Sequence, residues 1–220
     1  MSLTLHAFPH SPRGFKVLAA ANHLGLDYEF RFVDLGKGDQ KRPEFLALNP
    51  NGRMPVLEDD AFVLWESNAI LQYLADKKPE AGMLPMSARG RADVTRWMFW
   101  DASHWDPICA IFIFEHVVKG FLKTGAPDAA EIAKGEQRFH QFAPVLEIQL
   151  KMHKFVCGDK PTVADFSLAS PLYYAEPAKI PLAPYAAIRR WYTDMSALPA
   201  WKETSERNLA APPRDFSLGA

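Results

Sequence analysis

Cysteine is scarce in this sequence of 220 residues, where only Cys109 and Cys157 occur. The two positions lie far apart and match neither a C-x-x-C motif nor the spacing of a metal site. A disulfide framework is therefore excluded, and a cysteine nucleophile is not expected. We also expect no metal cofactor.

Long apolar runs and targeting signals are missing as well. No apolar stretch approaches the roughly 18 to 20 residues that a membrane span requires. Residues 1–6 lack the positive and apolar regions of a secretion signal. We therefore expect a cytoplasmic protein that does not associate with a membrane.

An excess of charge of either sign is also absent. The chain has 25 Lys and Arg against 26 Asp and Glu, for a formal net charge of −1. This balance gives no electrostatic reason to expect nucleic acid as a partner. With 48% hydrophobic and 23% charged residues, the composition is that of a globular protein with one large or two small domains.

The first half of the chain does contain alternating strand and helix signals. A short strand is expected over residues 4–8, and a helix begins at Pro12, with Ser11 at its N-cap. The helix ends at Gly25, and alternating aromatic residues over 28–32 predict a second strand. Such a βαβ unit places its two strands in parallel.

A hairpin and a helix are expected next. Turn residues over 49–52 precede two strand-like stretches over 54–57 and 61–65, and helical spacing follows over 69–78. The predicted order of elements is therefore βαβ followed by ββα.

The second half predicts helices and no convincing strand. A long helix that begins near Ala88 continues past Trp105, and Pro107 is expected to kink it. Thr162 and Asp165 form a pair similar to a capping box at the start of a further helix. We interpret this pair as a folding element without a catalytic role.

Three segments, over residues 49–57, 64–74 and 158–165, carry a family resemblance through their order and spacing. With them, the chain resembles a cytosolic glutathione transferase over nearly its full length. It is most similar to the serine-type phi, theta and related bacterial classes, because Ser11 falls at the family's catalytic position.

The resemblance implies an α/β thioredoxin-like domain that binds glutathione over residues 1–79. A linker over 80–88, an all-helical domain over 89–207 and an irregular tail over 208–220 would follow. The helical domain would hold a small hydrophobic electrophile, and the protein would be a homodimer.

Ser11 is the expected catalytic residue, because a free thiol has a pKa of about 8.5 and is mostly protonated near neutral pH. A hydroxyl donor and a helix N-terminus would both stabilise the thiolate of glutathione. Local sequence alone favours a simpler role, in which the Ser11 oxygen accepts from the Gly14 N–H; the family position favours catalysis. His10 is a rival that is more typical of a solvated loop.

The resemblance also assigns positions to glutathione. Pro55 would follow a cis peptide bond, which would turn the Met54 main chain toward the tripeptide. Glu66 would pair with the γ-glutamyl ammonium, and Ser67 would bind the γ-glutamyl carboxylate at a helix N-terminus. The positions implied for the glycyl end are Gln40, Lys41 and Arg53.

Several of these assignments have a simpler alternative. Lys41 and Arg53 are also typical of solvated loop residues, and the family often has histidine or lysine where Gln40 stands. His104 and Trp105, with His10, are the candidates for the electrophile pocket, although core packing would explain most aromatic residues of that helix.

Other functions on the same fold stay open at this point. Without a cysteine in the first domain, no mixed disulfide with glutathione can form at the Ser11 position, which argues against thiol transfer. A glutathione-dependent isomerase, dehalogenase or peroxidase remains an alternative to conjugation. A binding protein of this fold that does not catalyse a reaction is the other.

Overall fold

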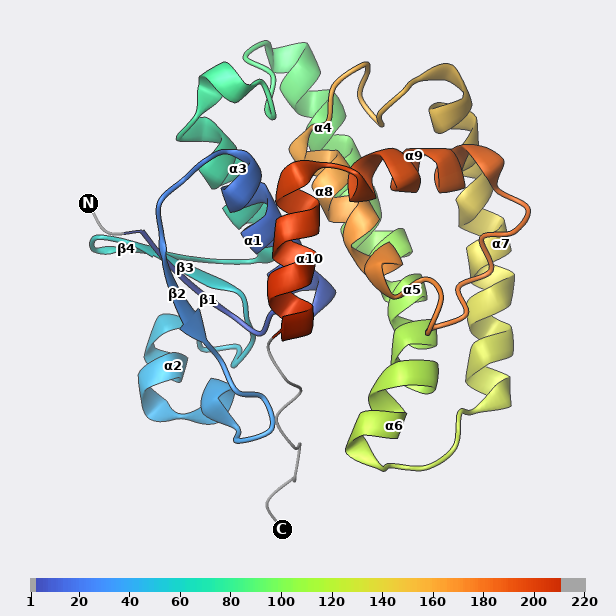
Figure 1. Ribbon diagram of the computed structural model, residues 1–220, viewed down its shortest axis with the longest axis horizontal. Coiled ribbons are helices and arrows are strands. Elements are labelled where there is room, and N and C mark those ends of the chain that lie inside the picture. The colour runs from blue at the N-terminus through green and yellow to red at the C-terminus, as the bar shows by residue number, and fades with distance from the viewer. Residues whose placement is uncertain (1–2, 211–220) are drawn as a thin grey trace. The chain divides into compact units, whose positions relative to one another are not determined.

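A computed structural model describes residues 3–210 (Figure 1), and the remaining terminal residues lie outside this description. The chain forms two compact units. Among the described residues, the first comprises residues 3–81 and 198–210, and the second is Gly82–Ala197. The C-terminal helix thus belongs to the first unit, whereas the sequence placed residues 198–207 in the helical domain.

A four-stranded mixed sheet forms the centre of the first unit, as the βαβ-ββα pattern predicted. The strand order is β2-β1-β3-β4. Strand β1 pairs in parallel with β2 and antiparallel with β3, which pairs antiparallel with β4. The strands are β1 (Leu3–Ala7), β2 (Glu29–Phe32), β3 (Val56–Asp59) and β4 (Phe62–Trp65).

Helices cover this sheet, and α1 is the most deeply buried of them. It contacts both α3 and α10, and its residues from Gly14 to Ala21 are all buried. Near α2, a smaller cluster of buried side chains joins Val33, Phe45 and Val56. The helical elements are α1 (Pro12–His23), η1 (Asp39–Lys41), α2 (Pro43–Leu48), α3 (Ser67–Asp76), η2 (Pro79–Ala81) and α10 (Pro199–Ala210).

Helix α10 also bears on the predicted tail. It extends to Ala210, so the chain is still helical where an irregular segment was expected from residue 208. The rest of that predicted tail, residues 211–220, lies outside the described residues.

The second unit is helical, and the part of the chain that the structure describes there contains no strand, in agreement with the sequence. Its first half is one long helical run that includes two π-helical turns, η3 and η4. The elements are α4 (Ala88–Trp100), η3 (Asp101–Trp105), α5 (Asp106–Ile113), η4 (Phe114–Val118), α6 (Lys119–Leu122), α7 (Ala129–Met152), α8 (Val163–Ala169), η5 (Ser170–Tyr174) and α9 (Ala186–Ser196).

The irregularity expected at Pro107 takes the form of the π-helical turn η3. Proline has no N–H to donate, and its ring crowds the carbonyl group of the preceding turn. The widened turn relieves this crowding, since the Asp106 N–H donates to the Asp101 carbonyl five residues earlier.

Asp165 is the buried hub that organises the start of α8. One carboxylate oxygen accepts from the Thr162 N–H at 2.8 Å and from the Thr162 hydroxyl at 2.9 Å. The other accepts from the Val156 N–H at 2.8 Å and from Trp191 Nε1 at 2.9 Å. Burial raises the pKa of this carboxyl group, and the four donors act against that shift. The Asp165 side chain therefore has the structural role that its sequence position indicated.

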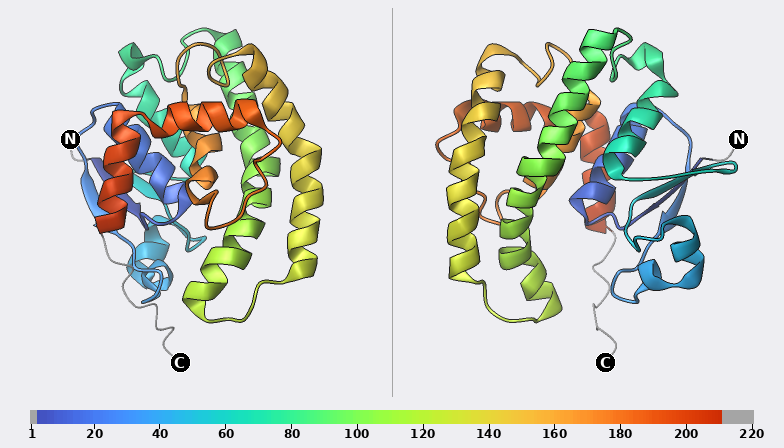
Figure 2. Two further views of the ribbon diagram at one scale, coloured as in Figure 1. Left: turned by 45° about the vertical axis from the view of Figure 1, so that its right-hand side comes forward. Right: turned by 180° about the vertical axis from the view of Figure 1, so that it is seen from behind.

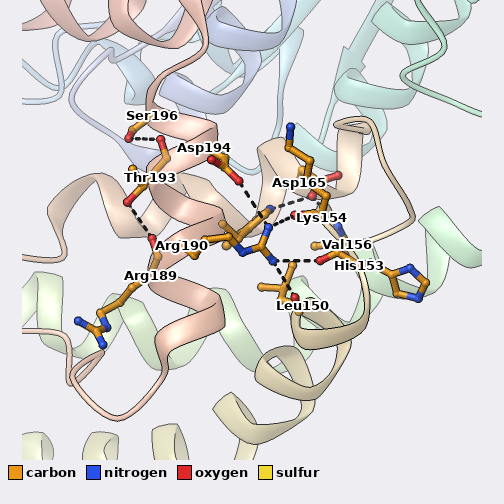
Figure 3. Close-up of polar contacts among 11 residues, drawn as sticks. Leu150, His153, Lys154, Val156, Asp165, Arg189, Arg190, Thr193, Asp194 and Ser196 are labelled. Carbon is orange, nitrogen blue, oxygen red and sulfur yellow. Dashed lines mark hydrogen bonds and ion pairs between the residues drawn. The ribbon is translucent and has the colours of Figure 1, made fainter.

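Arg190 joins α9 to the end of α7 (Figure 3). Its guanidinium group donates to the carbonyl oxygens of Leu150 at 2.7 Å, His153 at 3.0 Å and Lys154 at 2.8 Å. The last carbonyl groups of a helix have no partner within the helix. Arg190 supplies a partner to Leu150 in the last turn of α7 and to the two residues that follow Met152, the end of that helix.

Candidate active site

Ser11 lies at the N-terminus of α1, directly after the loop that leaves β1. Its backbone has the extended conformation of an N-cap residue, and its carbonyl oxygen accepts from the Phe15 N–H at 2.8 Å. Its side chain makes no capping hydrogen bond. The side-chain cap expected from local sequence is therefore absent, and the half-buried hydroxyl group does not accept from the first turn of the helix.

The first turn of α1 is held close to β1. A Cβ atom added to Gly14 would lie 2.5 Å from the Phe8 carbonyl oxygen, a distance that only glycine tolerates. The Ser11 N–H also donates to this oxygen, at 3.0 Å. Ser11 is thus fixed to the end of β1 by its main chain and by the close packing of Gly14.

The loop before β3 is organised by the buried side chain of Asn49. Its Nδ2 donates to the Arg53 carbonyl at 2.6 Å, and its Oδ1 accepts from the Asn51 N–H at 3.0 Å. Gly52 follows with a φ of 60°, in the region that favours glycine. The sequence predicted a turn here, but it did not single out Asn49 as the residue that shapes the loop.

Met54 and Pro55 connect this loop to β3, and the peptide bond between them is cis, which confirms the prediction. Pro55 is buried. The Met54 side chain packs against the cluster formed by Val33, Phe45 and Val56. Met54 therefore lies between the loop and the core of the first unit.

Glu66 and Ser67 form the start of α3. Glu66 has a φ of 70°, a conformation that residues other than glycine rarely adopt, and its side chain is exposed. Its carbonyl oxygen accepts from the Ile70 N–H at 3.0 Å. Backbone strain of this kind gathers at ligand-binding positions. The Ser67 hydroxyl group lies at the N-terminus of α3, a place suited to a carboxylate.

The residues predicted for the glycyl end lie in η1 and in the loop before β3. The main chain of Gln40, in η1, lies close to Gly52, since an added Cβ atom there would be 3.1 Å from the Gln40 oxygen. Arg53 follows Gly52, and both Arg53 and Lys41 are exposed. Within residues 3–210, Gln40 Oε1 is buried without a hydrogen-bond partner.

The pocket candidates differ in their surroundings. Trp105 is fully buried, and its Nε1 donates to the Leu168 carbonyl at 2.9 Å, so it is a core residue and not a lining of an open pocket. His104 is half-buried and stacks on Phe142, with 4.5 Å between ring centroids. His10 is half-buried in the loop between β1 and α1.

Both cysteines lie in the second unit and are poor nucleophiles. Burial raises the pKa of the fully buried Cys109 thiol well above its ordinary value. Burial also raises the pKa of Cys157, to about 12. Since the thiolate is the reactive form, neither side chain provides a nucleophile near neutral pH.

The described residues contain no group of three or more His, Cys, Asp and Glu side chains arranged to hold a metal ion. None of the helices in residues 3–210 is long and apolar enough to cross a membrane.

Two family models match the sequence. The first, described as "Glutathione S-transferase, N-terminal domain", matches residues 1–76. The second, described as "Glutathione S-transferase, C-terminal domain", matches residues 104–199. Together the two matches span most of the sequence.

Individual relatives resemble the chain over nearly its whole length. Glutathione S-transferase 3 of Zea mays is 34% identical over 222 aligned residues, which cover 98% of each chain. The crystal structure of glutathione transferase F7 from Populus trichocarpa is 30% identical, with a TM-score of 0.86 over 93% of this chain and 98% of that one. A glutathione S-transferase from Pseudomonas fluorescens is 31% identical, with a TM-score of 0.82 over 91% and 97% of the two chains.

Proposed function

Because this chain belongs to the glutathione S-transferase family and is a glutathione transferase, we propose that Ser11 activates glutathione for attack on a small hydrophobic electrophile. The Ser11 hydroxyl donates a hydrogen bond to the glutathione sulfur and favours its thiolate form. The thiol proton passes to solvent, and the sulfur lone pair forms a bond to the electrophilic carbon. The electron pair of the broken bond leaves with the leaving group.

The observation that carries this proposal is the state of the Ser11 side chain. It lies at the N-terminus of a helix, where the helix dipole favours a negative charge, and it does not cap that helix. The O–H of a hydroxyl group in this place is available to donate a hydrogen bond to an anion. Such a donor lowers the pKa of a bound thiol by hydrogen bonding to the charged form.

Glutathione binds in this proposal through both of its charged ends. The first turn of α3 and the Ser67 hydroxyl hold the γ-glutamyl carboxylate, while Glu66 pairs with the γ-glutamyl ammonium. The main chain of Met54 pairs with the peptide as a strand does. Lys41 and Arg53, which are exposed beside the Asn49 loop, bind the glycyl carboxylate together with Gln40.

His104, in the helical unit, is the proposed contact of the electrophile in that unit. The packing of Trp105 in the core removes it from this role. We also retain the homodimer and the cytoplasmic location as predictions.

Substitution of Ser11 by alanine tests the proposal. We expect Ser11→Ala to lose most conjugation of an aryl halide and to bind glutathione with nearly unchanged affinity. Since the hydroxyl makes no cap, the free energy of unfolding should change little. Steady-state kinetics, calorimetric titration with glutathione and thermal unfolding measure the three quantities.

Ser87→Ala is the matched control, because Ser87 does cap a helix. Its hydroxyl oxygen accepts from the Gly90 N–H at 3.1 Å at the start of α4. This variant should lose about 0.5–2 kcal/mol of stability and keep its activity per folded molecule. Full conjugating activity of Ser11→Ala would contradict the catalytic role. Retention on glutathione resin without turnover of aryl halides, epoxides or peroxides by the unmodified protein would instead support a binding protein.

A further inference from the structure

The C-terminal helix α10 lies beside α1, the helix whose N-cap residue is Ser11 (Figure 2). The two helices are far apart in the sequence and belong to the same compact unit. The nature of their contact therefore determines how α1 is held.

The first contact joins the N-terminal turn of α1 to α10. The rings of Phe15 and Trp201 meet edge to face, with 4.8 Å between their centroids and an angle of 71°. Phe15 is fully buried and Trp201 is 2% exposed. Phe15 lies one turn after Ser11, and its N–H donates to the Ser11 carbonyl oxygen. A shift of the Phe15 ring therefore acts on the turn that carries Ser11.

A second contact holds the other end of α1. Asn22 donates from Nδ2 to the Thr204 hydroxyl oxygen at 2.8 Å and accepts from the Tyr28 hydroxyl at 3.0 Å. The Thr204 hydroxyl in turn donates to the Ala200 carbonyl at 2.7 Å within α10. Helix α10 thus contacts α1 near both of its ends.

Three consecutive residues of α1 face three different elements. Gly14 packs on the end of β1, Phe15 packs on α10, and Lys16 donates from Nζ to Asn68 Oδ1 on α3 at 2.6 Å. The first turn of α1 is therefore fixed from three directions. Of the three contacts, the one with α10 comes from the opposite end of the chain.

We infer that Trp201 is a positioning residue for Ser11, an inference that rests on the catalytic role proposed above. Trp201 fixes Phe15, Phe15 fixes the first turn of α1, and that turn sets the direction of the Ser11 hydroxyl. Rates of well-oriented reactions are steep functions of position, and a misplacement of about 1 Å costs on the order of 100-fold. Helix α10 thus supports the turn of the first unit that carries Ser11.

Replacement of Trp201 tests the inference through a split between kcat and KM. We expect Trp201→Leu to lower kcat for conjugation of an aryl halide by about tenfold, while the KM for glutathione changes by less than about twofold. The pKa of the bound glutathione thiol should rise toward that of the free thiol. Trp201→Phe keeps an aromatic edge against Phe15 and should restore kcat to within about threefold.

A milder pair of variants covers the case in which Trp201→Leu does not fold. Thr204→Val removes the acceptor for Asn22 and should raise the pKa of the bound thiol in the same direction, by less. Thr193→Val is its matched control in α9, where the Thr193 hydroxyl donates to the Arg189 carbonyl at 2.9 Å. This control should leave both kcat and the thiol pKa unchanged.

The outcomes separate this inference from the proposed function. The positioning role would be overturned if folded Trp201→Leu had the kcat and the thiol pKa of the unmodified protein. If only Thr204→Val folds, the same result for that variant would overturn it. An equal loss in Thr193→Val would overturn it as well, because the effect would then be one of general stability. If Ser11→Ala retains full activity, the proposed function fails independently of the Trp201 result.

Discussion

At the scale of single residues, Glu66 combines strain with exposure. It has a φ of 70° at a position where glycine would be comfortable, and its side chain is exposed. A strained backbone conformation lowers stability, and an exposed side chain does not offset this by burial. The conformation is explained when the side chain binds a ligand. The proposed pairing with the γ-glutamyl ammonium is such a function.

We therefore expect Glu66→Gly to bind glutathione at least tenfold more weakly, since a charge-assisted hydrogen bond contributes about 1.5–3 kcal/mol. The same variant should be as stable as the unmodified protein or more stable, because the positive φ no longer costs energy. Calorimetric titration and thermal unfolding measure the two effects.

Asp60→Gly provides the control for this variant. Asp60 also has a positive φ, of 53°, and lies in the turn between β3 and β4. It should gain stability without any change in glutathione affinity. Unchanged affinity in Glu66→Gly would remove Glu66 from the proposed site.

The sequence predicted some residues of the site better than others. The strand-to-helix turn at Ser11 and the turn before Pro55 follow from local signals, because proline and glycine restrict the backbone directly. The hydrogen bonds of Asn49 with Arg53 and Asn51 depend on the three-dimensional course of the loop, which local sequence patterns do not describe. The burial of Trp105 likewise depends on packing against distant residues such as Leu168.

At the scale of elements, Asp59 joins the β3–β4 hairpin to α3. Its carboxylate accepts a hydrogen bond from the Tyr73 hydroxyl at 2.6 Å and another from the Lys77 ammonium group. The hydrogen bond from Lys77, followed by that from Tyr73, holds the pKa of Asp59 below its ordinary value. The charged form is therefore favoured in the folded state.

The sign of the resulting pH dependence follows from this lowered pKa. The stabilisation is present above the unfolded value of 3.8 and is lost as the pH falls through the lower folded value. We expect Asp59→Asn to be less stable than the unmodified protein at neutral pH, with a difference that shrinks below about pH 4. Chemical unfolding across this pH range measures it.

Asp60→Asn, a change at the neighbouring exposed residue, is the control. At neutral pH it should lower the free energy of unfolding by less than Asp59→Asn does, because it leaves the hydrogen bonds of Asp59 to Tyr73 and Lys77 in place. A stability difference for Asp59→Asn that grows on acidification would contradict the assignment.

The contact between α7 and α9 gives a second prediction for elements. Arg190 donates to carbonyl oxygens of Leu150, His153 and Lys154, and lysine has no planar fork that reaches them together (Figure 3). Arg190→Lys should lower the free energy of unfolding by about 1 kcal/mol or more. Arg189→Lys, one position earlier and also exposed, should change it little. Equal stability of the two variants would show that the contacts of Arg190 contribute nothing.

At the scale of the whole molecule, the first unit is discontinuous in sequence. The order βαβ followed by ββα was predictable, because hydrophobic periodicity and turn residues are local signals. The return of α10 to α1 was not, since periodicity shows that a helix has a buried face and does not show what buries it. The burial of Trp201 and its contact with Phe15, which the structure shows, identify α1 as the helix that covers this face of α10.

The pKa of the glutathione thiol in the complex tests the proposed role of Ser11 most directly. It is measured from the ultraviolet absorbance of the thiolate as a function of pH, with the unmodified protein and with Ser11→Ala at saturating glutathione. We expect a pKa below that of free glutathione in the unmodified complex and a clear rise in Ser11→Ala. The same thiol pKa in both complexes would contradict the proposal that Ser11 stabilises the thiolate.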